Sequence, residues 1–142
     1  MRRFIFAVSL AAFCFILVSA DRAAAEIMVQ IDRATQTMRV GVDGFYRYTW
    51  RVSTGRPGYG TPAGTFHPHV LARRWFSHKY YNSPMPHAIF FAGGLAIHGS
   101  YEISHLGGPA SHGCIRLHPT NAAVLYGLIE HEGMRNTTIV VQ

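Results

Sequence analysis

Two stretches decide how this chain can be arranged: LAIHGS at residues 95–100, and PASHGCIRLHP at residues 109–119. The first has the composition of a buried strand that ends on a histidine and a glycine. The second places a cysteine beside a glycine, and it ends on a proline that can start a helix. A cysteine nucleophile needs a base, donors for an oxyanion and room for a carbonyl to approach. Together the two stretches predict a site around Cys114.

Two histidines are candidates for the base that takes the proton of Cys114. His98 stands near the end of the expected strand, from which it can reach a facing loop. His112 lies two residues before the cysteine, and in an extended chain such residues point to the same face. Spacing alone does not choose between them.

The residues next to the cysteine supply candidate oxyanion donors and a positive charge. Gly113 permits close approach of backbone, and its amide and that of Cys114 can point at a developing negative charge. Arg116 would depress the thiol pKa or hold a substrate carboxylate.

Alternation of apolar and polar residues predicts strands outside the two stretches. Residues 27–31, 38–42 and 45–52 should form a three-stranded meander whose second hairpin turns at Asp43-Gly44, and 45–52 should be half exposed. Further strands are expected at 65–66, 88–91, 95–98 and 137–141.

The remaining segments are expected to be loops and one helix. Residues 54–64, rich in glycine and proline, should be an ordered loop, and residues 67–87 an aromatic excursion that covers one face of the sheet. A helix should begin at Pro119 and stop at Gly133. The residues expected on its apolar face are Val124, Leu125, Leu128 and Ile129.

The N-terminus has the pattern of a secretory signal. Met-Arg-Arg precedes an apolar run of 17 residues, 4–20, and small residues follow at 23–25. We expect residues 1–25 to be a cleaved signal peptide and residues 26–142 to be one periplasmic domain with no stable membrane anchor. The alternative is an uncleaved anchor, because the run is near the lower limit for a bilayer of ~30 Å.

Composition excludes several classes of protein. With 49% hydrophobic residues, nine Phe and seven Tyr, the chain is neither disordered nor collagen-like. Removing residues 1–25 leaves ten basic and six acidic side chains and a single cysteine, Cys114. The positive charges are scattered apart from Arg73-Arg74, so a nucleic-acid partner is not expected, and an anionic wall polymer fits better.

IHG at 97–99, SHGCIRL at 111–117 and TPAGTF at 61–66 closely resemble the L,D-transpeptidase family, whose catalytic module is called the YkuD domain. The resemblance covers most of residues 26–142. It implies a mainly β fold, a β-sandwich with a mixed sheet and one main helix alongside.

The resemblance also implies roles for particular residues. They are Cys114 as nucleophile, His98 as base, the Gly99 carbonyl as its orienting acceptor, His112 on the substrate and oxyanion side, Ser111 at the start of the motif, and Arg116 where relatives carry Arg or Asn.

The implied reaction is cross-linking of peptidoglycan stem peptides without a cofactor. Cys114 would form a thioester at the third stem residue and release D-alanine, and the amine of a second stem would resolve it into a 3-3 cross-link. Water as acceptor would make the protein an L,D-carboxypeptidase. A lysine of an outer-membrane protein would make it a protein-anchoring enzyme. The motif does not separate these outcomes.

Other residues admit weaker interpretations. His67 and His69 could be metal ligands in a non-catalytic periplasmic metal- or wall-binding protein, but no cysteine or carboxylate pair accompanies them at zinc spacing, so no metal is expected. His87 could line the cleft. Tyr80, with Tyr81 and Met85, could form a lid over it, or could be core filler.

Overall fold

The computed structural model describes residues 23–142, so the predicted signal peptide lies almost wholly outside the described residues. Between residues 23 and 142, the structure has no helix of the length and apolarity needed to cross a membrane. The strands are β1 (Ile27–Asp32), β2 (Thr37–Val42), β3 (Phe45–Arg51), β4 (Gly64–Phe66), β5 (Val70–Ala72), β6 (Phe76–Ser77), β7 (Ser83–Pro84), β8 (Ala88–Ala92), β9 (Leu95–Gly99), β10 (Ile115–Leu117) and β11 (Thr137–Val141). The helices are α1 (Pro119–Glu132) and the 3-10 turns η1 (Ile103–His105) and η2 (Met134–Asn136).

The larger sheet has the strand order β3-β2-β1-β11-β4. The meander β1-β2-β3 is antiparallel as predicted, and β11 pairs with β1 in parallel, which makes the sheet mixed. Ile27, Val29 and Ile31 of β1 are fully buried and alternate with half-buried residues. Period-two alternation therefore turns one face of this sheet to the core.

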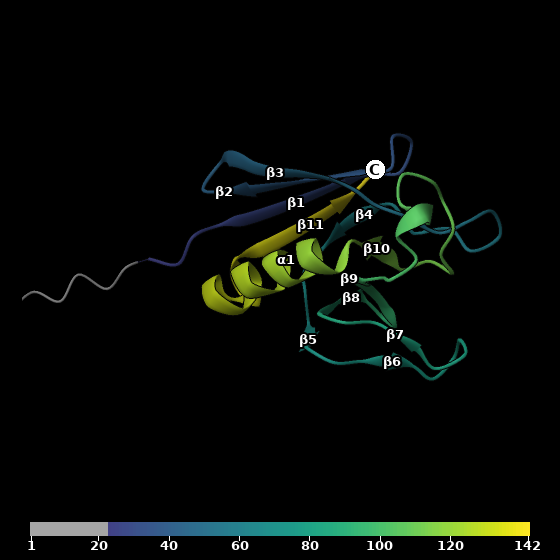
Figure 1. The fold of residues 1–142 in the computed structure, drawn as a ribbon. Coiled ribbons are helices and arrows are strands. Elements are labelled where there is room, and N and C mark those ends of the chain that lie inside the picture. The colour runs from purple at the N-terminus through teal and green to yellow at the C-terminus, as the bar shows by residue number, and fades with distance from the viewer. Residues whose placement is uncertain (1–22) are drawn as a thin grey trace, which may run out of the picture.

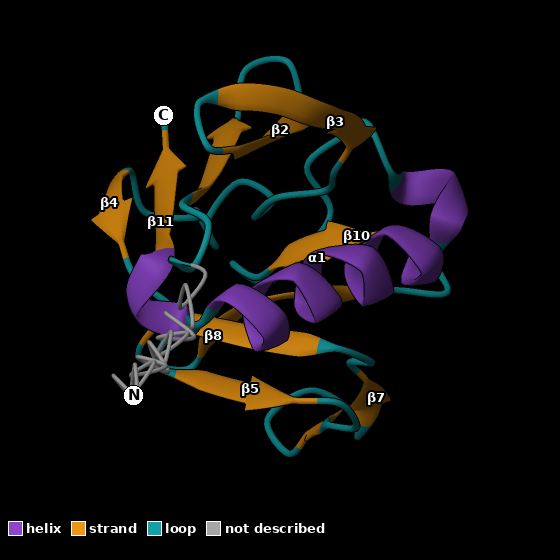
Figure 2. Cartoon of the chain, turned by 90° about the vertical axis from the view of Figure 1, so that its left-hand side faces the viewer, coloured by secondary structure: helices purple, strands orange, loops and turns teal. Residues whose placement is uncertain are grey.

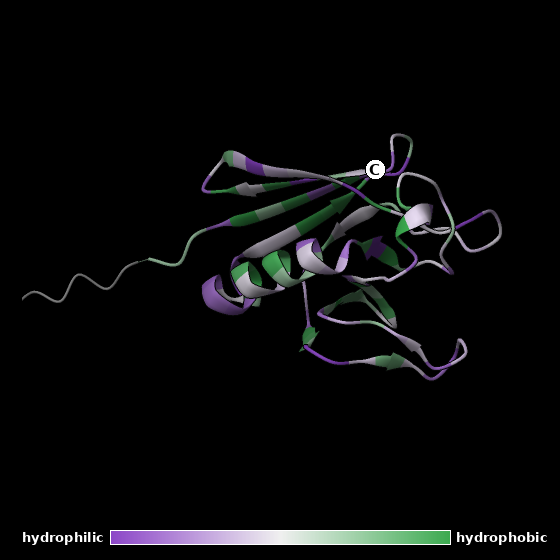
Figure 3. Cartoon of the chain, in the orientation of Figure 1, coloured by the Kyte–Doolittle hydropathy of each residue, from purple (hydrophilic) through white to green (hydrophobic). Residues whose placement is uncertain are grey.

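The smaller sheet has the order β10-β9-β8-β5, with β9 and β10 parallel. Figures 1 and 2 show α1 running along the two sheets, with the larger sheet on one side and β8 and β5 on the other. Figure 3 shows hydrophobic residues along β1, β11 and α1, which meet in the main core. The mainly β fold with mixed sheets and one main helix is confirmed.

The two middle strands of the smaller sheet, β8 and β9, divide their side chains between two apolar clusters. On β9, Ile97 belongs to the main core, whereas Ala96 belongs to a second cluster that includes Met85 and contacts Cys114. On β10, Ile115 is in the main core. The face turned away from the main core is the one on which Cys114 lies.

The helix has the predicted ends, but its buried face is rotated from the prediction. The buried residues Ala122, Leu125, Tyr126 and Ile129 follow the i, i+3, i+4, i+7 spacing of one helical stripe. Val124 lies outside this stripe and is 36% exposed, so its assignment to the apolar face was wrong.

Five strands, β3, β5, β6, β7 and β10, differ from the sequence expectation. The aromatic excursion 67–87 contains β5, an edge strand of the smaller sheet, and the hairpin β6-β7, so it is less irregular than predicted. β10 was not predicted. β3 is exposed at every residue but Trp50, rather than on one face, because it is the edge strand of its sheet.

Candidate active site

Two neighbouring parallel strands bring Cys114 and His98 to one face of the smaller sheet. Cys114 immediately precedes β10, and the register pairs Arg116 of β10 with His98 of β9. The amide of Ala96 donates a hydrogen bond to the Cys114 Sγ at 3.4 Å. In the described chain no hydrogen bond joins Sγ to His98; apo sites often tighten such contacts only when substrate binds.

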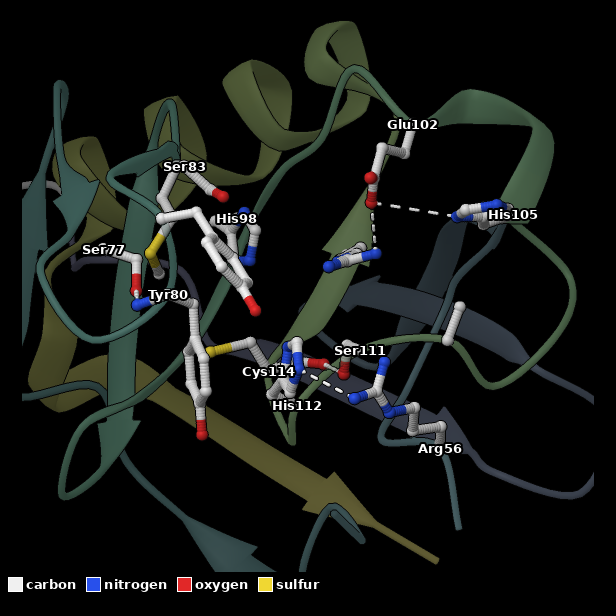
Figure 4. A pocket seen from close by; sticks show the side chains of 14 residues that line it. Arg56, Ser77, Tyr80, Ser83, His98, Glu102, His105, Ser111, His112 and Cys114 are labelled. Carbon is white, nitrogen blue, oxygen red and sulfur yellow. Dashed lines mark hydrogen bonds and ion pairs between the residues drawn. The ribbon is translucent and has the colours of Figure 1, made fainter. Parts of the chain in front are cut away.

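Cys114 lines two hollows. Figure 4 shows the side chains that line the first of them. The first has a volume of about 260 Å³ and has basic side chains in its wall. The second, of about 400 Å³, has Trp75, Phe90 and Leu95 in its wall. The residues common to both are Ser77, Tyr80, Met85, His112 and Cys114.

His98 is buried and oriented by the backbone. Its Nδ1 lies 2.7 Å from the carbonyl oxygen of Gly99, which can only accept, so Nδ1 carries the proton and Nε2 has a free lone pair. Burial lowers the pKa of His98 to about 4; the Gly99 hydrogen bond opposes this shift, and the Arg116 charge adds to it. The imidazole is therefore neutral at physiological pH.

The thiol of Cys114 is also neutral at rest. Burial raises its pKa, and this effect outweighs the Ala96 hydrogen bond and the charge of Arg116, which both lower it. As expected, Arg116 lowers the thiol pKa. Burial raises it by more, so the thiol pKa is raised overall. The arrangement can perform general-base chemistry, in which the proton leaves Sγ as the nucleophile attacks.

Ser111 closes the loop that carries the cysteine. Its hydroxyl donates to the Cys114 carbonyl at 2.5 Å and accepts from the Gly113 amide at 3.0 Å. The Gly113 N–H is thus already bonded, contrary to the expectation that it faces a substrate oxyanion. Among the described residues the Cys114 N–H has no hydrogen-bond partner, so it remains available as a donor.

His112 is surrounded by side chains from two other segments. Its Nε2 lies 3.0 Å from Nη2 of Arg56. Tyr80 stacks on its ring at a centroid distance of 4.1 Å, and Tyr59 meets the ring edge-on at 4.9 Å. Slight burial and the Arg56 charge lower the pKa of His112. The chain is not extended here, since Gly113 has φ +116, so alternation is not the reason that His112 and Cys114 line the same hollows.

The loop 54–61 supports the cysteine loop from behind, a role that the sequence did not reveal. The buried Thr61 hydroxyl donates to the Gly113 carbonyl at 2.8 Å and accepts from the Gly55 amide at 2.9 Å. A Cβ on Gly55 would lie 1.8 Å from the carbonyl oxygen of Tyr59, so this tight turn requires glycine. The only sequence signal was the density of glycine and proline before TPAGTF.

Arg116 lies in the wall of the first hollow and is held by an ion pair. Its Nη1 is 2.5 Å from Oε2 of Glu102, and His105 approaches the same carboxylate oxygen at 3.8 Å. Only 17% of the Arg116 side chain is exposed. Glu102 was not singled out from the sequence, because it belongs to no local motif that indicates a functional site.

The remaining candidates divide into two groups. Tyr80, Tyr81 and Met85 line the first hollow, as a lid would. His87 is not among the described residues that line either hollow, and its ring packs edge-on against Tyr126 of α1. His87 therefore lies on the helix side of the sheet and is not proposed as a cleft residue.

Residues 23–142 contain no group of three or more His, Cys, Asp and Glu side chains that could hold a metal ion. His67, one of the two histidines weighed as ligands, is within hydrogen-bond distance of the Thr137 carbonyl, at 2.8 Å from Nδ1.

The fold and the site together define a class, the YkuD-type domain with a cysteine and two histidines at one sheet face. The family model of the L,D-transpeptidase catalytic domain matches residues 26–141. The chain belongs to the L,D-transpeptidase family. Among curated proteins, none matches it significantly by sequence.

Solved structures of L,D-transpeptidases share this fold. One from Mycobacterium smegmatis is 28% identical, with a TM-score of 0.74, and the match covers 83% of this chain and 59% of that chain. One from Stackebrandtia nassauensis is 26% identical (TM-score 0.70; 89% and 61% covered), and one from Xylanimonas cellulosilytica is 26% identical (TM-score 0.71; 85% and 62% covered). This chain thus spans about three fifths of the length of these chains.

Proposed function

We propose that the protein is an exported peptidoglycan L,D-transpeptidase that works in the periplasm through a thioacyl intermediate on Cys114. The observation that carries the proposal is the placement of Cys114 and His98 on one face of the smaller sheet, both lining one open hollow. A buried thiol without access to solvent would not support it.

The first half-reaction uses Cys114 and His98. Sγ attacks the carbonyl of the third stem residue while His98 Nε2 takes the thiol proton, and the Gly99 carbonyl stabilises the imidazolium through Nδ1–H. The Cys114 N–H and His112 donate to the oxyanion. When the intermediate collapses, the imidazolium gives its proton to the nitrogen of the departing D-alanine, which leaves a thioester.

The second half-reaction repeats these steps with an acceptor. The side-chain amine of another stem gives a proton to His98 and attacks the thioester, and the proton returns to Sγ as the thiol leaves. Two hollows that share Cys114 suit a donor and an acceptor that react at the same Sγ one after the other. The acceptor that we favour is the stem amine, and outer-membrane protein lysines and water are the alternatives to be tested.

Defined muropeptides test this proposal. The protein incubated with disaccharide-tetrapeptide should release D-alanine, carry an acyl adduct on Cys114 and produce 3-3 dimers, all visible by mass spectrometry. Cys114→Ser should do none of these. If the wild type neither releases D-alanine nor forms an adduct, the proposal is wrong. If it produces tripeptide without dimer, it is a carboxypeptidase.

A β-lactam gives an independent probe of the thiol. LD transpeptidase LdtMt1, one of the solved neighbours, is described in complex with imipenem. We expect imipenem to add its mass to wild-type protein and not to Cys114→Ala. If the protein instead carried stoichiometric metal that was lost in His112→Ala, the non-catalytic metal-binding alternative would be favoured.

A further inference from the structure

We propose that Arg56 is a positioning residue that holds His112 in the neutral tautomer protonated on Nδ1. His112 then acts only as a hydrogen-bond donor, and His98 is the only base. The catalytic consequence rests on the proposed function; the tautomer itself does not. Sequence spacing alone did not choose between the two histidines, and this contact supports His98, the base that the resemblance implied.

The argument begins with the chemistry of the two partners. A guanidinium has five N–H donors, no acceptor, and stays protonated in proteins. Its Nη2 lies 3.0 Å from Nε2 of His112, so Nε2 must be the acceptor and can carry no proton. A neutral imidazole has one proton, which is then on Nδ1. The lone pair that could act as a base is already used by Arg56.

Two aromatic rings keep His112 in this orientation. Tyr80 lies against the ring face, with 13° between the planes, and Tyr59 meets its edge at 86°. Arg56 itself lies over the Tyr59 ring, 4.8 Å from the centroid. Figure 4 shows Tyr80 and Arg56 on different sides of His112. A half turn of the ring about the Cβ–Cγ bond would put Cε1 where Nε2 lies and would break the contact with Arg56.

The backbone also fixes Arg56 in position. Its amide donates to the Ser111 carbonyl at 3.0 Å, and its own carbonyl accepts from Tyr59 at 2.9 Å. Gly55 permits the tight turn that contains Arg56, in which the Tyr59 carbonyl returns close to Gly55. Arg56 is therefore hydrogen-bonded to the loop that carries His112 and Cys114.

The positive charge has a second effect that supports the same assignment. The Arg56 cation disfavours a second proton on His112 and helps to lower its pKa. His112 therefore stays neutral at physiological pH with one N–H to offer. By contrast, His98 Nε2 is left unprotonated by the Gly99 contact and lines the hollow that contains the thiol.

The tautomer can be read directly from histidine ¹⁵N chemical shifts and their couplings to ring protons. In wild-type protein we expect His112 to show the Nδ1–H form across neutral pH. Arg56→Met, which keeps length but has no donor, should give the Nε2–H form or a mixture of the two and raise the His112 pKa. Arg56→Lys should restore most of the Nδ1–H form, because the ammonium can donate to Nε2.

Kinetics complete the test. Acylation by imipenem should slow by about tenfold to a hundredfold in Arg56→Met, less than the roughly 10²–10³-fold cost of removing one oxyanion donor outright, and recover partly in Arg56→Lys. The matched control is Arg39→Met, which removes a cation that covers Tyr46 on the larger sheet. We expect it to change neither the tautomer nor the rate.

Two results would overturn the proposal: His112 in the Nε2–H form in wild-type protein, or an unchanged Nδ1–H form and rate in a folded Arg56→Met. The outcome for the proposed function is separate. If the tautomer responds to Arg56 as described but even the wild type never forms an adduct at Cys114, the assignment of Arg56 is supported and the transpeptidase proposal fails.

Discussion

Cys114 and His98 form a pair in which both groups are neutral at rest. Burial raises the thiol pKa and lowers the imidazole pKa, so each group disfavours its charged form. A preformed thiolate-imidazolium pair would require the opposite shifts. In the proposed reaction, charge would therefore develop only during attack, when the Gly99 carbonyl and the oxyanion donors can stabilise it.

This arrangement predicts the pH dependence of acylation. Because His98 takes up a proton only near pH 4, the second-order rate constant with imipenem should stay level from about pH 8 down to pH 5. Stopped-flow measurements between pH 4 and pH 9 would check this. An acid limb centred at pH 6.5 would mean that the base is a solvated histidine and not His98.

Removing the base should leave the fold intact. His98→Gln keeps a polar group of similar size, and we expect it to slow acylation by about 10²-fold or more while circular dichroism stays unchanged. His131→Gln, at an exposed position on α1, is the matched control. If His98→Gln acylates at the wild-type rate, the base assignment is wrong and His112 becomes the candidate.

The loop 54–61 holds the loop that carries Cys114 in place through Thr61. Thr61→Val preserves shape but leaves the Gly113 carbonyl and the Gly55 amide without their partner, which should cost roughly 1–3 kcal/mol of unfolding free energy. The acylation rate should also fall. Urea denaturation and imipenem kinetics measure the two effects, and Thr65→Val, at an exposed position, is the control. If Thr61→Val and Thr65→Val had the same unfolding free energy and acylation rate, Thr61 would not support the cysteine loop.

The hairpin β6-β7 is the element that would act as a lid. Its two short strands pair only with each other, so the hairpin adds little to the core, whereas Tyr80 on its turn stacks on His112. We expect Tyr80→Ala to lower turnover with little change in Tm. A lower Tm with unchanged turnover per folded molecule would show that Tyr80 is a packing residue.

For the whole molecule, the buried His98 links stability to pH. In the unfolded chain this histidine binds a proton below about pH 6.5, whereas in the folded protein it does so only near pH 4. The free energy of unfolding should therefore fall as pH drops from 6.5 to 4, by roughly 3 kcal/mol from this group. Urea titrations of wild type and His98→Gln at several pH values would isolate the effect. If both proteins lost the same unfolding free energy between pH 6.5 and pH 4, His98 would not be the cause.

Much of the molecule follows from its sequence. Alternation along β1 predicted a strand, because a strand with one buried face needs period two, and the buried apolar run at 95–98 predicted another. Pro119 and Gly133 predicted the ends of α1. Cys114, between a glycine and an isoleucine and with His98 upstream, indicated the site.

Tertiary pairing decided the rest. Burial of Cys114 and His98, which sets the direction of both pKa shifts, depends on strands that come from separate segments. Arg56 meets His112 across 56 residues of sequence, and Thr61 meets Gly113 across 52, at distances that local patterns do not encode. Periodicity reports which face of a segment is buried; only the packed chain determines which distant side chain lies against it.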